Sequence, residues 1–311
     1  MGRPATPPPN DLPAEGANGP LIGTLGVVGV GLIGGSIAAA ALKRCVANRV
    51  IGFGRDAARL SAARDAGLLD DGSTDPQEAA GVDLLVVCTP VGRIAADVRR
   101  FAADLGAAAV VTDAGSVKGP ICEELRDVPR FVGSHPLAGS EKSGWEHADA
   151  HLFAGRVTVV CGEPDDDRAA AVSRFWRALG SRVEWMAPEE HDARLARTSH
   201  LPHAMAAALC LAADADPRPG RGDGRLTSTG FADTTRVAAG DPALWADIFH
   251  GNAAAVGDAV DRLAERLGAL SAALSARDRG QIETWLADAA ERRQQLIGAS
   301  LTGSDPSKGI A

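Results

Sequence analysis

Three glycines near the start of the chain, Gly29, Gly31 and Gly34, have the spacing of the phosphate-binding motif G-x-G-x-x-G. An apolar run typical of a buried strand precedes them (residues 25–28), and a helical run follows (residues 36–42). In that setting the first glycine permits a tight turn, the second lets the backbone approach a pyrophosphate, and the third lets helix and strand pack closely. The start of the helix offers N–H groups and a partial positive charge to the phosphates. A tight turn without a ligand is the alternative, and the flanking strand and helix favour a dinucleotide site.

The type of dinucleotide depends on the end of the second predicted strand, where an acidic side chain usually binds the adenosine ribose. This chain has Gly54 there, followed by Arg55 and Asp56. Without a carboxylate at position 54 a 2′-phosphate is not repelled, and the Arg55 guanidinium can pair with it. The sequence therefore favours NADP over NAD; the alternative is a solvated Arg55, with Asp56 on the ribose. The predicted cofactor contacts are Gly29, Gly31, Leu32, Ile33, Gly34, Arg55, Thr89 and Pro90.

A histidine and a serine are placed to act on a substrate beside that cofactor. His135 and Ser116 each follow a predicted strand. Ligands of open α/β sheets bind beyond the carboxyl ends of the strands, so both side chains are expected in one crevice. A neutral imidazole is a suitable general base. His200 and His203 stand at the start of the second half of the chain, and the other four histidines are expected to be surface or structural: His147, His151, His191 and His250.

The elements that must position these residues change in kind near residue 187. Before it, strand-like runs alternate with helical stretches, which predicts βαβ units and a doubly wound parallel sheet of the Rossmann type. The predicted strands are residues 25–28, 49–53, 84–88, 109–112, 130–132 and 157–160. After it, apolar residues recur at steps of three and four from Val256 to Leu274, which indicates a long helix. Asp278 with Gln281 resembles a capping pair that opens a last helix.

The predicted organisation has four parts: a disordered leader (1–21), a dinucleotide-binding domain (22–187), an all-helical domain (188–301) and a disordered tail (302–311). The leader is rich in proline and glycine, a composition that does not build a core. Apolar helical domains beside Rossmann domains often form dimers, so we expect a homodimer.

The composition of the 311 residues excludes several classes of protein. The formal net charge is -8 and charges of both signs are interspersed, which does not fit a nucleic-acid binder. No apolar run approaches the ~20 residues that cross a bilayer, and the polar first residues do not resemble a signal peptide. The five cysteines are scattered, which argues against a disulfide framework or a zinc site and fits a reducing cytoplasm.

Five segments, taken together and in order, resemble the prephenate/arogenate dehydrogenase family (TyrA, or cyclohexadienyl dehydrogenase). They are GVGLIGGS, DAGSVKG, GSHPLAGSEKSG, SHLPH and GFADTTRVAAGDPALW, and the resemblance runs from about residue 24 to about residue 295. It implies oxidative decarboxylation of a cyclohexadienol on the way to tyrosine. Prephenate would give 4-hydroxyphenylpyruvate and CO2, and arogenate would give tyrosine and CO2. Because aromatisation expels the carboxylate, the reaction needs neither a metal nor a covalent intermediate.

The resemblance also implies roles for individual residues. His135 matches the family histidine that accepts the proton of the ring hydroxyl. Ser116 matches a serine that shares this hydroxyl's hydrogen bond and orients the imidazole. Arg236 matches the arginine that binds the substrate carboxylate, a task suited to a bidentate guanidinium; an ion pair with a neighbouring aspartate is the structural alternative. His203 matches a histidine near the substrate side chain, or is a satisfied structural histidine.

The sequence departs from the family at one position that bears on the substrate. Ala232 stands where members often have Lys or Arg, and losing a cation would reduce repulsion of the arogenate ammonium group. The residues Ser140, Glu141 and Lys142 match a loop that frames the pocket, or form a solvated charge run. Two other functions stay open: a β-hydroxyacid dehydrogenase of the 6-phosphogluconate type, which uses a catalytic lysine, and a non-catalytic dinucleotide-binding sensor. The presence of His135 together with Arg236 argues against both.

Overall fold

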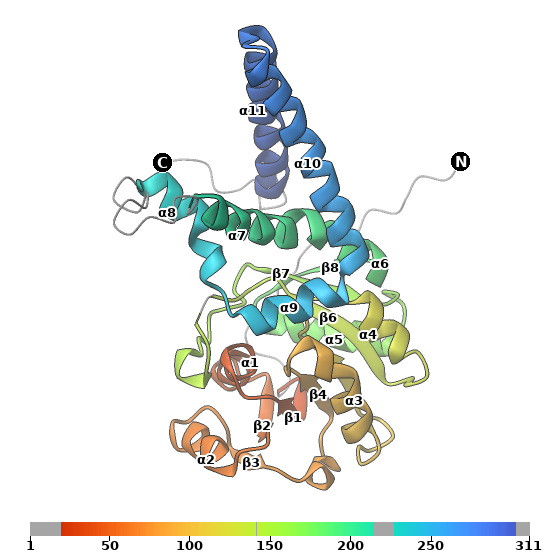
Figure 1. Cartoon of the computed structure of the whole chain (residues 1–311). Helices are drawn as coiled ribbons and strands as arrows, with labels where there is room; N and C mark the ends of the chain where they lie inside the picture. Colours follow the sequence, from red (N-terminus) through yellow and green to blue (C-terminus); the bar gives the residue numbers. More distant parts are fainter. Residues whose placement is uncertain (1–19, 141, 214–226, 303–311) are drawn as a thin grey trace, which may run out of the picture. The chain divides into compact units, whose positions relative to one another are not determined.

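The computed structural model describes residues 20–140, 142–213 and 227–302 (Figure 1). They belong to two compact units, one reaching to Val256 and one beginning at Gly257, and each is described by itself. The predicted leader and tail, apart from their inner ends, lie outside the described residues. The division between the two compact units lies at residues 256 and 257 and does not test the predicted domain boundary at residue 187. That boundary stays a prediction.

An eight-stranded sheet forms the centre of the first unit, in the order β3-β2-β1-β4-β5-β6-β7-β8. The strands are β1 (Ile22–Val28), β2 (Ala47–Phe53), β3 (Asp71–Ser73), β4 (Leu84–Val87), β5 (Val110–Asp113), β6 (Phe131–Pro136), β7 (Val157–Cys161) and β8 (Arg182–Trp185). All six predicted strands are confirmed. The sequence does not predict β3 and β8, because both are short and neither is a continuous apolar run.

The predicted parallel pairing is wrong at one place, where β7 runs antiparallel to β6. The other neighbouring strands are parallel. Two parallel neighbours need a crossover connection, usually a helix. Between Pro136 and Val157 the described chain forms loops and only the short turn η3 (Trp145–His147), so β7 returns in the opposite direction.

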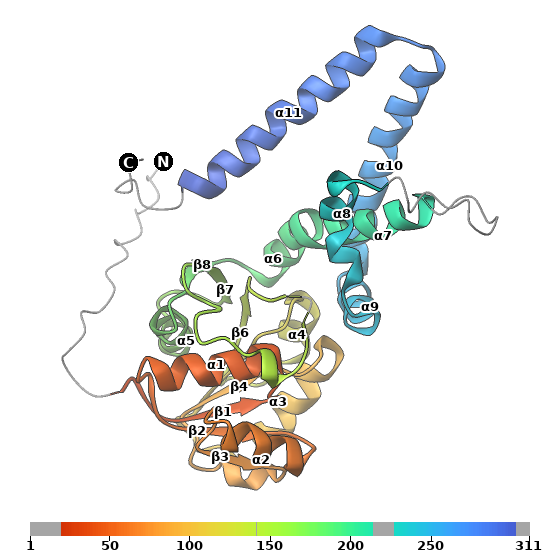
Figure 2. The same ribbon diagram turned by 90° about the vertical axis from the view of Figure 1, so that its left-hand side faces the viewer.

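Helices cover both faces of the sheet, which explains why its strands are apolar on both sides. Figure 2 shows α1 and α5 on one side of the sheet and α3 and α4 on the other. Along β4, Leu84 and Val86 pack into the core beneath α1 and α5, whereas Leu85 and Val87 pack into the core beneath α3 and α4. The helices that end before residue 252 are α1 (Leu32–Lys43), α2 (Ala57–Asp65), α3 (Ile94–Ala102), α4 (Gly119–Glu124), α5 (Asp167–Ala178), α6 (Pro188–Leu195), α7 (Leu201–Ala213), α8 (Thr229–Thr235) and α9 (Pro242–Gly251).

The strand order reverses direction at β1, which has β2 on one side and β4 on the other. In an open α/β sheet the connections leave opposite faces at such a point, and a crevice opens beyond the carboxyl ends of the two central strands. The glycine turn follows β1 and Thr89 follows β4. The topology thus brings the predicted cofactor contacts to one edge of the sheet.

Between α6 and α7 the helix widens into a π-helical turn, Ala196–His200. The cause is Pro202 in the first turn of α7, which has no N–H to donate and crowds the carbonyl group of Thr198, four residues earlier. A π-helical turn accommodates this clash without ending the helix. His200, in the π-helical turn, and His203, on α7, therefore belong to one continuous helical stretch.

The second unit contains most of α10 (Ala253–Ser275), which the apolar spacing predicts, and all of α11 (Arg279–Thr302). The predicted capping pair is present, because Gln281 donates its backbone N–H to Asp278 Oδ1 at 3.1 Å and its side-chain amide to Oδ2 at 2.7 Å. Apolar side chains of α10 face solvent in the single chain, with Leu267 44% and Leu274 55% exposed.

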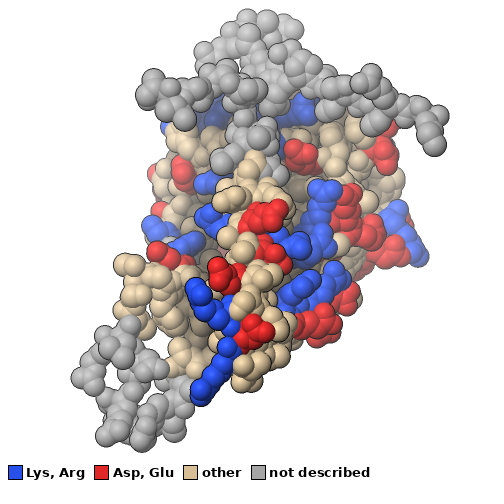
Figure 3. All heavy atoms as spheres, turned by 90° about the horizontal axis from the view of Figure 1, so that it is seen from above, with Lys and Arg blue, Asp and Glu red and all other residues tan. Residues whose placement is uncertain are grey.

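The surface carries charges of both signs. On the face drawn in Figure 3, basic and acidic side chains of the described residues are interspersed. None of the helices in the described part of the chain combines the length and the apolar composition that a membrane span requires.

Candidate active site

The glycine turn has the backbone geometry that the motif requires. Gly29 has φ +88°, a left-handed conformation that favours glycine. A Cβ atom at Gly34 would overlap the carbonyl oxygen of Gly29, so only glycine lets α1 pack this close to the turn. At Gly31, by contrast, a Cβ would meet nothing within 4 Å. Gly31 is the N-cap of α1 and provides no side-chain cap, so the N–H groups at the start of the helix stay available to an anion.

A cavity of about 540 Å³ opens beside this turn. Its lining includes the predicted contacts Gly29, Gly31, Arg55, Thr89 and Pro90. Two lining side chains have buried oxygen atoms without a hydrogen-bond partner among the described residues, Thr89 Oγ1 and Asp97 Oδ2. Polar ligand atoms would satisfy them, so the cavity fits a dinucleotide.

Three predicted contacts are not part of the cavity lining. Leu32 and Ile33 are the first residues of α1, and the Ile33 side chain packs against the core. Gly34 serves the close packing of helix and strand. These residues shape the turn, and their contact with a cofactor stays a prediction.

Basic side chains outnumber acidic ones around the cavity, with four arginines against two aspartates: Arg55, Arg59, Arg93, Arg100, Asp56 and Asp97. Asp56, the alternative ribose ligand, is the N-cap of α2. Its Oδ1 accepts hydrogen bonds from the backbone N–H groups of Ala58 (3.0 Å) and Arg59 (3.2 Å). Asp56 therefore has a structural role, and the side of the cavity near Gly54 and Arg55 is basic.

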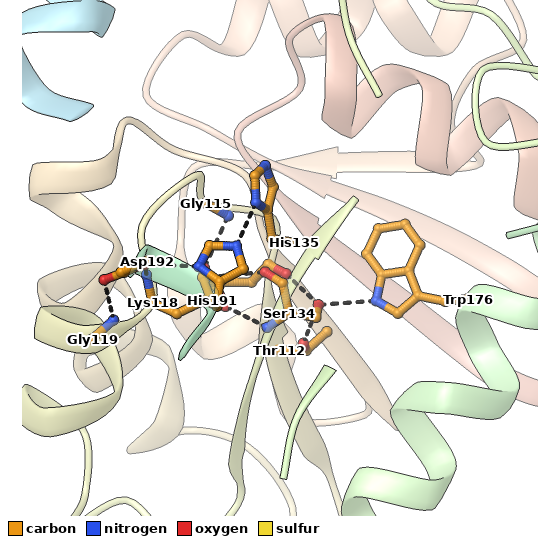
Figure 4. Close-up of polar contacts among 10 residues, drawn as sticks. Thr112, Gly115, Lys118, Gly119, Ser134, His135, Trp176, His191 and Asp192 are labelled. Atoms are coloured by element: carbon orange, nitrogen blue, oxygen red, sulfur yellow. Dashed lines mark hydrogen bonds and ion pairs between the residues drawn. The ribbon is translucent and has the colours of Figure 1, made fainter. Parts of the chain in front are cut away.

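His135, at the end of β6, is buried and forms one end of a hydrogen-bonded chain (Figure 4). Its Nδ1 atom lies 2.8 Å from Nε2 of His191, a fully buried residue of α6. Nδ1 of His191 lies 2.7 Å from Oδ1 of Asp192. Asp192 also accepts the backbone N–H groups of Lys118 (Oδ1, 2.8 Å) and Gly119 (Oδ2, 2.7 Å). The chain thus joins β6, α6 and the loop after β5.

The surroundings of His135 favour its neutral form. Its pKa is held well below the ordinary value, first by burial and then by the charges of His191, Lys118 and His200. The Lys118 ammonium group is fully buried, where it pairs with Asp113 and donates to the carbonyl oxygen of Ser134 at 3.0 Å. An imidazole that stays neutral at physiological pH and lies at the cofactor edge of the sheet can accept a proton.

His135 has a hydrogen-bond partner that the sequence does not predict. The sequence assigns the orientation of the ring to Ser116, which is half-buried on the loop between β5 and α4. That role of Ser116 stays a prediction, and in the structure Nδ1 of His135 contacts His191, which the sequence predicts to be a surface or structural residue. His191 lies 56 residues from His135 in the chain and has polar neighbours, so its burial could not be foreseen. The adjacent Asp192 is a weak signal of a hydrogen-bonded His191, because an acidic neighbour in the sequence does not indicate burial.

The histidines of the helical segment form a second cluster. The ring of His203 stacks on Trp245 of α9, with centroids 3.5 Å apart. Nδ1 of His203 is buried and has no partner among the described residues, and burial lowers the pKa of His203. Asn252 connects this cluster to the first, because its side-chain amide donates to the Asp192 carbonyl oxygen at 2.8 Å and lies 3.2 Å from Nδ1 of His200.

The remaining predicted substrate contacts lie on exposed segments. Arg236 begins the short turn η6 (Arg236–Ala239), which packs against α7. Ser140 is exposed on the loop after β6 and accepts the backbone N–H of Lys142 at 3.3 Å. Glu141 lies outside the described residues. Ala232 is exposed on α8. Among the described residues no group of three or more His, Cys, Asp or Glu could hold a metal ion.

Comparison with known proteins gives a consistent assignment along the chain. Residues 37–185 match the family model "Prephenate dehydrogenase, nucleotide-binding domain", and residues 187–288 match "Prephenate dehydrogenase, dimerization domain". The cyclohexadienyl dehydrogenase of Zymomonas mobilis is 33% identical over 261 residues, which cover 82% of this chain and 89% of that protein.

Solved structures agree with the sequence matches. The structure of prephenate dehydrogenase from Aquifex aeolicus in complex with hydroxyphenyl propionate and NAD+ is 31% identical, with a TM-score of 0.82 over 88% of this chain and 98% of that one. Synechocystis arogenate dehydrogenase is 28% identical, with a TM-score of 0.77 over 88% of this chain and 99% of that one. With its Rossmann-type sheet, glycine turn and helical segment, the chain belongs to the prephenate dehydrogenase (TyrA) family.

Proposed function

We propose that this protein catalyses the NAD(P)-dependent oxidative decarboxylation of prephenate or arogenate in tyrosine biosynthesis. The observation that carries the proposal is the buried, neutral His135 at the same edge of the sheet as the glycine turn. A bound nicotinamide supplies the acceptor for the hydride that leaves the ring carbon bearing the hydroxyl group. The cofactor is held by the start of α1 and by the lining of the cavity described above.

The residues of this chain control the proton that must leave with the hydride. His135 accepts the hydroxyl proton at Nε2, because Nδ1 already contacts His191. As the proton leaves, the ring carbon becomes carbonyl-like. Loss of the carboxylate as CO2 then leaves its electron pair in the ring, which becomes aromatic, and the resulting phenolate oxygen takes the proton back from His135. Ser116, from the neighbouring strand end, shares the hydrogen bond of the hydroxyl group.

Substrate binding is assigned to Arg236, His203, Ser140 and Glu141. Arg236 binds a carboxylate of the substrate. The turn η6, which begins with Arg236, packs against α7, the helix that carries His203, and this contact supports placing both residues at one site. Nδ1 of His203, which has no hydrogen-bond partner in the part of the chain that the structure describes, is available to a polar group of the substrate. Ala232, in place of a family cation, favours arogenate, because its ammonium group meets less repulsion. Steady-state kcat/KM with each substrate tests this preference, and a strong preference for prephenate would contradict it.

For the cofactor we propose NADP over NAD. Gly54 adds no carboxylate, Asp56 caps α2, and Arg55 and Arg59 line the same part of the cavity. Replacing Arg55 with Ala should lower the ratio of kcat/KM for NADP to that for NAD by about tenfold, the loss of one charge-assisted contact. Arg126→Ala, an exposed arginine on another loop, is the matched control and should leave the ratio unchanged.

A homodimer and a cytoplasmic location complete the proposal. The helical part of the chain matches a model described as a dimerization domain, and the exposed leucines of α10 give it an apolar face. Light scattering on the purified chain tests the dimer, and a monomer at micromolar concentration would contradict it.

The activity itself is tested by a four-way assay. Prephenate or arogenate is combined with NAD or NADP, and the nicotinamide absorbance is followed together with the aromatic product. We expect turnover in at least one combination. Turnover in none would reject the proposed function.

A further inference from the structure

We propose that His191 and Asp192 are positioning residues that fix the tautomer of His135, so that its lone pair lies on Nε2 and faces the substrate. The assignment of a proton-accepting role to that lone pair rests on the proposed function. The tautomer itself is a property of the protein alone and can be measured without any turnover.

The direction of the hydrogen bonds between His135, His191 and Asp192 follows from Asp192, whose carboxylate can only accept. Asp192 has three donors around its carboxylate: the backbone N–H groups of Lys118 and Gly119, and Nδ1 of His191. A carboxylate only accepts, so His191 carries its hydrogen on Nδ1. In the neutral ring Nε2 of His191 is then an acceptor, and the contact of 2.8 Å to His135 requires Nδ1 of His135 to donate. The neutral His135 is left with its lone pair on Nε2.

The anchor of this chain is rigid, because Asp192 is held from three elements. One backbone donor is Lys118, the last residue of the β5–α4 loop, and the other is Gly119, the first residue of α4. The Asp192 carbonyl oxygen accepts the side-chain amide of Asn252, the C-cap residue of α9. His191 is fully buried between this anchor and His135, so neither ring can turn without breaking a buried hydrogen bond.

The contacts of His135 with His191, and of His191 with Asp192, also affect the energy of protonated His135. Burial and the Lys118 ammonium group oppose a positive charge on His135 before the reaction. When His135 takes up the proton, its Nδ1–H donates more strongly to His191, and the Asp192 carboxylate stabilises the charge through that ring. Asp192 thus favours the protonated state of His135 only through a neutral His191 ring, because a charge on His191 would oppose it.

Two substitutions of His191 separate its two contacts. His191→Asn retains a donor close to Asp192 but does not reach His135, whereas His191→Gln retains an acceptor close to the position of Nε2. We expect His191→Asn to lower kcat by about 10²-fold, at the lower end of general-base effects, with KM and cofactor affinity unchanged. His191→Gln should recover about tenfold of that loss. His250→Asn, an exposed histidine on α9, is the matched control and should keep full kcat.

A double-mutant cycle and a spectroscopic readout distinguish positioning from a purely structural role. In a His135→Asn background, His191→Asn should change kcat by less than about threefold, because its effect passes through His135. Long-range ¹⁵N–¹H correlation spectra of the histidine-labelled protein should show His135 protonated at Nδ1 in the wild type. A kcat of His191→Asn within about threefold of wild type would overturn the proposal, as would an Nε2-protonated His135. If the wild type turns over neither substrate, the proposed function fails, and the spectra still decide the tautomer.

Discussion

The buried ammonium group of Lys118 and the carboxylate of Asp113 form an ion pair beside the strand that carries His135. Lys118 donates to the carbonyl oxygen of Ser134 at 3.0 Å, and Asp113 accepts the backbone N–H of Ser134 at 2.9 Å. The pair therefore holds both backbone polar groups of Ser134, the residue before His135. It also places a positive charge near the imidazole, which contributes to the lowered pKa of His135.

Removing one partner of this pair should destabilise the fold. Lys118→Met leaves the Asp113 carboxylate buried without its cation, which costs about 3–5 kcal/mol in comparable cases. Urea denaturation measures the change in the free energy of unfolding. Lys43→Met removes an exposed lysine and should cost about 0–1 kcal/mol. Similar losses for the two variants would contradict the importance of the buried pair.

The two glycines at the start of α1 should respond differently to the same added methyl group. Gly34→Ala overlaps the Gly29 carbonyl oxygen, so its melting temperature should fall. In Gly31→Ala the methyl group meets open space, so stability is retained while the approach of the pyrophosphate is blocked. We expect the dissociation constant for NADPH, measured by fluorescence, to rise by at least about tenfold in Gly31→Ala. Unchanged affinity would place the pyrophosphate elsewhere.

Folding stability should decrease in mild acid because of His200. Burial is the main cause that lowers the pKa of His200 to about 4, whereas the unfolded value is about 6.5. Between these values the unfolded chain binds a proton that the folded chain does not, so the free energy of unfolding falls as the pH drops from about 6.5 to about 4. His135 and His203 act in the same direction. Urea denaturation at several pH values should show a smaller decrease for His200→Gln, and an identical decrease would contradict this assignment.

The pH dependence of the reaction should reflect the lowered pKa of His135. A protonated imidazole cannot accept the hydroxyl proton, so kcat/KM falls only as the pH drops through that lowered value. We expect kcat/KM to be independent of pH around 6.5, the ordinary pKa of histidine. Lys118→Met, if it folds, should move the acid limb upward. An acid limb of the wild type above the ordinary value would show that another group is the base.

The sequence predicts the features that depend on local pattern. The apolar runs identify six strands, the glycine spacing identifies the turn after β1, and the Asp278–Gln281 pair marks the start of α11. Each of these signals lies within a few residues of the element that it predicts. The antiparallel β7 escapes prediction, because its direction depends on a long loop without a crossover helix.

Long-range contacts account for what the sequence does not predict about the site. Nothing near His191 in the chain indicates that it meets His135, and nothing near Asp192 indicates that it meets the backbone of Lys118 and Gly119. The helix cap formed by Asp56 is not predicted either, because the sequence indicates Asp56 only as a ribose ligand.

The central claim is that His135 is the general base of the dehydrogenase reaction. It is tested most directly by kcat of the purified His135→Asn variant with the substrate and cofactor that the wild type prefers. Because general bases contribute about 10²–10⁴-fold, kcat should fall by at least about 10²-fold, with the cofactor dissociation constant and the melting temperature close to wild type. A kcat within about tenfold of wild type would contradict the claim.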